Sequence, residues 1–171
     1  MIEPESEEAK VELARRISRR RKILAWFWVA CWGGVIWALG SDTFSASETS
    51  RWLMPFFQWL FGDVDVDTRY QTYGLVRKFA HLIEYAILAL LTFRAALIAA
   101  SRTQLATAAW VALFIVLALA TADEARQALS PVRTGSPIDI LIDLTGGLIA
   151  IVGLITISRR MRSASPVESS A

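Results

Sequence analysis

Charged and polar side chains interrupt the apolar stretches of this sequence at three places. Residues 77–85 read Arg-Lys-Phe-Ala-His-Leu-Ile-Glu-Tyr, residues 123–127 read Asp-Glu-Ala-Arg-Gln, and Asp139 and Asp143 open a further apolar stretch. A charged side chain costs at least about 2.5–3.5 kcal/mol at the centre of a bilayer, so one in a membrane segment needs a partner or a function. Such side chains could bind an anionic group, exchange a proton or hold a cation.

The spacing of these residues assigns them to helix faces. Residues three, four or seven positions apart lie on the same face of an α-helix. Lys78, His81 and Tyr85 have this spacing, so we expect them to point in one direction. The same rule predicts two further pairs, Asp139 with Asp143 and Asp123 with Gln127.

The elements that carry these residues are long apolar segments. The chain of 171 residues is 54% hydrophobic, against about 45–50% apolar content in soluble domains. A helix needs about 20 residues to cross a bilayer, and four stretches come near this length, at 23–40, 79–100, 104–122 and 138–157. The sequence therefore predicts an all-α polytopic membrane protein, a bundle of four transmembrane helices.

The membrane domain is expected to cover residues 23–157. A basic N-terminal segment, residues 1–22, precedes it, and a Ser-rich tail, residues 158–171, is expected to be disordered. We interpret the first apolar stretch as a retained helix, because it is long, rich in Trp and preceded by about twenty polar residues, unlike a cleaved signal peptide. Cys31 is the sole cysteine, which excludes an intrachain disulfide and a cysteine-based metal site.

The distribution of Lys and Arg predicts the orientation. Basic residues collect before the first span, ending in the run 19–22, and again after the last span at 159–162. Cytoplasmic flanks carry this excess, so we expect both termini in the cytoplasm. A basic run beside a membrane span indicates topology and attraction to anionic lipid headgroups. We therefore expect membrane lipids, and no nucleic acid, as partners.

This orientation brings the polar residues to one depth. The second span begins on the outer side, the third ends there and the fourth begins there. All three polar groups are thus expected near the outer surface, where opposite charges would neutralise each other. The convergence of three separate segments is a stronger signal than any one of them.

Two other features fall outside this cluster. The connection 41–78 contains an aromatic-rich segment at 52–61, for which we predict an amphipathic helix lying in the outer membrane interface. Arg94 lies sixteen residues beyond Lys78, or about 24 Å along a helix. That depth is close to the inner interface, where snorkelling toward lipid phosphates accounts for the arginine.

The sequence resembles the VanZ-like family of bacterial membrane proteins from about residue 23 to 157. The resemblance rests on the segments at 77–85 and 123–127, on Pro-Val-Arg-Thr-Gly at 131–135, and on Asp-Ile-Leu-Ile-Asp-Leu-Thr-Gly-Gly at 139–147. These are similar, in order and approximate spacing, to the family pattern K-x-x-H-x-x-E-Y, D-E-x-x-Q, R-x-G and D-x-x-x-N/D-x-x-G. Asp143 stands where many relatives carry Asn.

The resemblance implies a multi-pass protein of the bacterial cytoplasmic membrane. The founding member of the family is linked to low-level resistance to the lipoglycopeptide teicoplanin, while membership leaves the biochemical mechanism open. It therefore implies a role at the cell envelope and leaves open whether this chain contributes to antibiotic resistance.

Three functions are compatible with the polar cluster. The leading hypothesis is recognition of an anionic lipid, a lipid-linked cell-wall intermediate or a lipoglycopeptide through the basic trio Lys78, Arg126 and Arg133. The second is an enzyme acting on a lipid phosphate, with His81 as general acid or base and Asp139 and Asp143 holding a divalent cation. The third is a structural or partner-docking role.

The sequence leaves the choice between binding and catalysis open and identifies no cofactor and no separate metal site. The candidate binding residues are Lys78, His81, Glu84, Tyr85, Asp123, Glu124, Gln127, Arg133, Asp139 and Asp143.

Overall fold

The computed structural model describes residues 7–44, 59, 62, 65–99, 104–131, 133 and 135–164. These residues form helices and connections, and none of them lies in a strand, as predicted. The elements in chain order are α1 (Glu7–Leu39), the short 3-10 helix η1 (Asp42–Phe44), α3 (Val66–Ala99), α4 (Leu105–Ala128) and α5 (Pro137–Ala164). The interfacial helix predicted at 52–61 lies outside the described residues apart from Trp59.

In the described part of the chain, four helices contain a segment long and apolar enough to cross a membrane. Their outer faces carry large apolar side chains, and Trp110 and Phe114 on α4 are each 71% exposed. Apolar surface of this extent is unfavourable in water and is stable against lipid tails. The four-helix membrane bundle predicted from the sequence is therefore confirmed. The spanning segments are Glu7–Leu39, Gly74–Ala99, Leu105–Ala128 and Pro137–Arg160.

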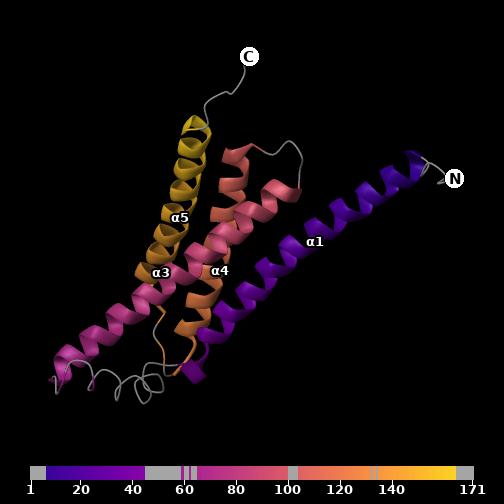
Figure 1. Ribbon diagram of the computed structural model, residues 1–171. Helices are drawn as coiled ribbons and strands as arrows, with labels where there is room; N and C mark the ends of the chain where they lie inside the picture. The colour runs from indigo at the N-terminus through magenta and orange to yellow at the C-terminus, as the bar shows by residue number, and fades with distance from the viewer. Residues whose placement is uncertain are drawn as a thin grey trace.

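Helix α3 lies at the centre of the bundle. It crosses the pair formed by α4 and α5, while the N-terminal half of α1 projects away from the other helices (Figure 1). The first turns of α1 and the last turns of α5 lie toward one end of the bundle (Figure 1). The end of α4 and the start of α5 lie at the opposite end, which is where the polar residues are found.

Small side chains allow the helices to approach closely. On α4, every fourth residue from Ala108 through Ala112 and Val116 to Ala120 is fully buried. Gly146 on α5 is also buried, and a methyl group there would overlap the backbone carbonyl of Leu82 on α3. Without a hydrophobic driving force between helices in lipid, such close van der Waals contact is a main source of helix association.

Three of the helices extend beyond the predicted spans. Helix α3 begins at Val66 rather than near 79, because Asp65 caps it, accepting a 2.6 Å hydrogen bond from the Thr68 amide. Helix α1 begins at Glu7, so most of the basic segment 1–22 is helical. Helix α5 continues to Ala164, so residues 158–164, expected within the disordered tail, are helical as well. Arg, Lys and Glu are good helix formers, which accounts for the extension of α1, and the three Arg residues at 159–162 favour that of α5.

Candidate functional site

Polar side chains are buried where the beginning of the α3 span, the end of α4 and the beginning of α5 meet. The structure brings together the three polar groups that the sequence placed at one depth. Burial of a polar or charged group is costly unless it has a partner, so each group needs its contacts traced. The buried polar residues at this end are His81, Asp123, Glu124, Gln127 and Asp143.

A continuous series of side-chain contacts links α5, α3 and α4. Arg77 Nη2 on α3 lies 3.6 Å from Asp139 Oδ2 on α5 and donates a 2.5 Å hydrogen bond to Gln127 Oε1 on α4. Gln127 Nε2 then donates to Asp123 Oδ2 at 2.7 Å. Gln127 thus uses both ends of its amide, and a positive and a negative side chain are joined through it.

Arg126 extends this network to α1. Its Nη2 donates to Asp123 Oδ1 at 2.6 Å and to the backbone carbonyl of Trp37 at 2.8 Å. The same guanidinium lies 4.2 Å from the centroid of the Trp37 ring, a cation–π contact. We refer to the side chains of Arg77, Asp123, Arg126, Gln127 and Asp139 as the ionic network.

The end of α1 fits closely over the ionic network. Gly40 is buried, and a methyl group there would overlap Asp123 and the Arg126 guanidinium. Arg133, from the connection before α5, donates a 3.2 Å hydrogen bond to the Leu39 carbonyl. A side chain at position 40 would therefore displace the Asp123 and Arg126 side chains.

His81 and Asp143 form a second, deeper pair. His81 Nδ1 on α3 lies 3.2 Å from Asp143 Oδ1 on α5, and the two side chains are 10% and 1% exposed. Tyr85, one turn further along α3, is fully buried and stacks beside His81, with the ring centroids 6.2 Å apart. Within the described ranges, the Tyr85 hydroxyl and Asp143 Oδ2 are buried without a hydrogen-bond partner.

Glu124 holds the beginning of α5. Its Oε2 accepts a 2.6 Å hydrogen bond from the Ser136 amide, and the Ser136 hydroxyl accepts a 3.2 Å hydrogen bond from the Ile138 amide in the first turn of α5. Gly135 lies against the α4 backbone, where a methyl group would overlap the Glu124 carbonyl. These contacts favour a structural role for Glu124.

The cationic side chains here are more exposed than the anionic ones. The Arg77 and Arg126 side chains are 31% and 28% exposed, whereas those of Asp139, Asp123 and Asp143 are 14%, 2% and 1% exposed. We refer to the partly exposed guanidinium groups beside the buried carboxylates as the rim. Among the residues that the structure describes, the buried Nε atoms of Arg77 and Arg126 lack a hydrogen-bond acceptor.

Arg133 joins this rim electrostatically. Burial lowers the pKa of its guanidinium from the ordinary value, and the nearby charge of Arg77 lowers it further. Arginine stays protonated in proteins even so, so the two cations repel each other. An anion placed among them would relieve that repulsion.

Lys78 is one of the predicted binding residues that lie outside the ionic network. Its side chain is exposed, and the neighbouring Arg77 makes the contacts to Gln127 and Asp139. Lys78 was predicted to share a helix face with His81 because the two are three residues apart. Arg77 lies four residues before His81, a spacing that places it on the same face equally well. Arg77 was therefore missed as a site residue, although its spacing to His81 could have indicated it.

The two carboxylates of α5 have separate partners. Asp139 faces Arg77, and Asp143 faces His81. In the described part of the chain, no three His, Cys, Asp or Glu side chains are grouped as a metal ion would need. The arrangement therefore does not favour the hypothesis that Asp139 and Asp143 hold one divalent cation together.

The fold and the buried ionic network define a class: a small polytopic membrane protein with a polar centre at one end of its helix bundle. The VanZ/LLP1 family model matches residues 24–158, most of the chain and at least part of each of the four spans, so the protein belongs to this family. No curated protein and no solved structure matches the chain significantly.

Proposed function

We propose that this VanZ-family protein recognises an anionic headgroup at the outer face of the bacterial cytoplasmic membrane. The observation that carries the proposal is the rim of partly exposed guanidinium groups beside buried carboxylates. Arginine presents a planar set of donors that matches phosphate or carboxylate. Candidate ligands are an anionic lipid, a lipid-linked cell-wall intermediate or a teicoplanin-type lipoglycopeptide.

The carboxylates prepare the rim for such a ligand. Asp139 and Asp123 hold Arg77 and Arg126 in fixed positions, which reduces the entropy lost when a ligand binds. The buried Nε donors of these two arginines lack an acceptor among the described residues, so a ligand that displaces the atoms covering them would gain hydrogen bonds. Arg133 adds a third guanidinium group, for which a phosphate is a suitable counter-charge.

The orientation belongs to the same proposal. The basic residues before α1 and after α5 favour the cytoplasm for both termini. The ionic network lies at the opposite end of the bundle and would then face outward. A headgroup in the outer leaflet would reach it without crossing the membrane.

The test is native mass spectrometry of the protein purified from bacterial membranes, with and without added teicoplanin. We expect an anionic lipid or the lipoglycopeptide to be retained by the wild-type protein and to be lost in Arg77→Gln and Arg133→Gln. Lys78→Gln is the matched control, because it removes one charge at the same depth outside the ionic network. Equal retention in all variants, with folding preserved, would contradict the proposal.

A second candidate, an enzyme acting on a lipid phosphate, is favoured by the His81–Asp143 pair. A carboxylate at 3.2 Å can orient an imidazole as general acid or base. The measurement is phosphate release from a polyprenyl diphosphate in detergent by wild type and His81→Gln, each with and without chelator. Wild-type turnover that is insensitive to chelator and is lost in His81→Gln would support catalysis by the pair. The lack of turnover by the wild-type protein would count against it.

A further inference from the structure

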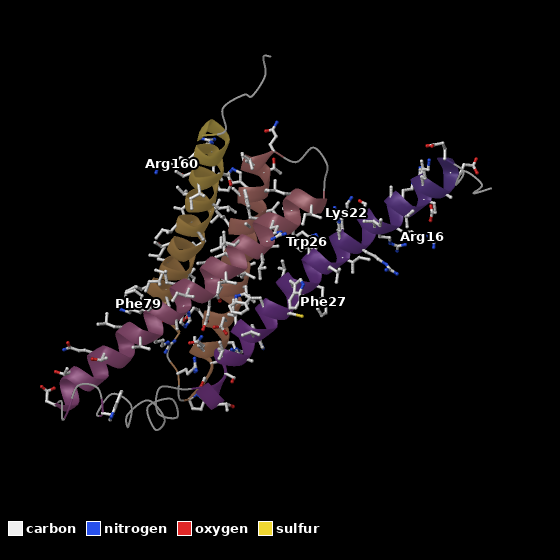
Figure 2. The ribbon with its side chains drawn as sticks, in the orientation of Figure 1. Arg16, Lys22, Trp26, Phe27, Phe79 and Arg160 are labelled. Atoms are coloured by element: carbon white, nitrogen blue, oxygen red, sulfur yellow. The ribbon has the colours of Figure 1, made fainter. Side chains whose placement is uncertain are left out.

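A groove at the other end of the bundle runs between α1 and α3. It encloses about 930 Å³ and is walled mainly by apolar residues of both helices, among them Ile17, Leu24 and Trp28 on α1 and Leu91 and Ile98 on α3. Figure 2 shows Lys22 and Trp26 of α1 beside the C-terminal end of α3, the region where the groove lies. The groove forms where α1 diverges from the bundle (Figure 1).

The charged residues lining this groove are both arginines. Arg21 comes from α1 and Arg94 from α3, and no Asp or Glu is among the lining residues. Arg94 lies within the spanning segment Gly74–Ala99, where an exposed charge is costly unless a counter-charge is present. None of the carboxylates in the described ranges forms an ion pair with Arg94, which leaves the lipid phosphates toward which it snorkels as its counter-charge.

The depth of an arginine along its helix indicates which kind of ligand the groove would bind. Arg94 lies five residues before the end of its span at Ala99, or about 7.5 Å along the helix. The 26-residue span is about 39 Å long, against about 30 Å for the hydrocarbon core of a bilayer, so Arg94 lies near the edge of that core, from which its long side chain can reach the phosphate layer. The groove thus offers an apolar wall for acyl chains and two guanidinium groups for a phosphate.

From this charge complementarity we propose that the α1–α3 groove is a binding site for one anionic phospholipid. Its phosphate lies between Arg21 and Arg94, and an acyl chain lies along the apolar wall toward Trp28. The lipid comes from the leaflet opposite the ionic network. It fills the gap between the diverging helices and so fixes the angle at which α1 leaves the bundle.

The experiment is native mass spectrometry in detergent with added phosphatidylglycerol and with phosphatidylcholine of the same acyl chains. We expect the wild-type protein to retain one phosphatidylglycerol in preference to phosphatidylcholine. Arg21→Gln and Arg94→Gln should each weaken its retention about fivefold, since one basic residue near a membrane surface contributes about that factor toward anionic lipid. Arg20→Gln, which removes an adjacent charge outside the groove, should retain the lipid.

A second variant separates residence in the groove from general attraction to a basic surface. Ser18 lines the groove, so Ser18→Trp should fill it and displace the lipid while both arginines remain. Loss of the lipid in Ser18→Trp and in the two arginine variants supports the site. Equal retention in those variants, or an equal loss in Arg20→Gln, overturns it.

The readout is independent of the proposed headgroup recognition. Arg77→Gln alters the opposite end of the bundle and should leave the groove lipid in place. If the groove proposal is wrong, the phosphatidylglycerol adduct will be unaffected by substitution of Arg21 or Arg94, whatever the result at the ionic network.

Discussion

At the scale of single residues, partners decide the role of each buried charge. Asp123 satisfies both carboxylate oxygens through Gln127 and Arg126. Asp143 uses one oxygen for His81, and its other oxygen is buried without a partner among the described residues. The first arrangement is typical of a structural link, whereas the second leaves an acceptor that a ligand or a water molecule could use.

The His81–Asp143 pair gives a prediction at this scale. Asp143→Ala should lower the free energy of unfolding by about 1–3 kcal/mol, because His81 Nδ1 would lose its buried hydrogen-bond partner. Asp143→Asn keeps an oxygen acceptor and should lower the free energy of unfolding by less. Thermal unfolding in detergent, followed by circular dichroism, measures both. The same loss in the two variants would show that the carboxylate charge, rather than the hydrogen bond, stabilises the bundle.

At the scale of the elements, the approach of α5 to α3 sets the geometry of the site. Gly146 lies against the backbone carbonyl of Leu82, one residue after His81. A side chain at position 146 would force the helices apart and increase the separation between His81 and Asp143. The spacing of α3 and α5 therefore controls the deeper polar pair.

Glycine substitutions on α5 test this dependence. Gly146→Ala should destabilise the protein by about 1–3 kcal/mol through overpacking. Gly153→Ala is the matched control, because no atom lies within 4 Å of the added methyl group and alanine favours the helix by up to about 1 kcal/mol. Unfolding midpoints of the two variants should move in opposite directions. Shifts of the same sign in the two variants would show that the contact between position 146 and Leu82 does not limit the stability of the protein.

At the scale of the whole molecule, two charged regions occupy opposite ends of one bundle. The ionic network closes the end near the α4–α5 connection, and the arginines of the α1–α3 groove lie toward the end where α1 begins and α5 finishes. Both regions lie at the edges of apolar spans. A protein of this shape can contact both leaflets while its centre holds apolar side chains.

Cysteine labelling tests the orientation of the molecule. In a Cys31→Ser background, Leu129→Cys marks the end with the ionic network, where Leu129 is 88% exposed, and Ser158→Cys marks the other end. An impermeant thiol reagent added to intact cells should label position 129, and it should label position 158 only after permeabilisation. The reverse pattern would place the ionic network in the cytoplasm and contradict headgroup recognition from outside.

The sequence by itself determined the fold class and the depth of the site. Four apolar segments of membrane-spanning length can satisfy their backbone only as helices in lipid. The order of the helices then brings residues 77–85, 123–127 and 139–143 to one end. Their convergence follows from chain direction and helix length alone.

Only the tertiary structure decided which side chains meet. Arg77 and Lys78 are adjacent in the sequence, but they point about 100° apart on the helix. The rotation of α3 about its axis selects Arg77 for the network and leaves Lys78 exposed. That rotation is fixed by distant contacts such as Gly146 against Leu82, and the closeness of Gly40 to Asp123 likewise arises from packing. Sequence spacing defines a helix face, whereas the neighbouring helices determine where that face points.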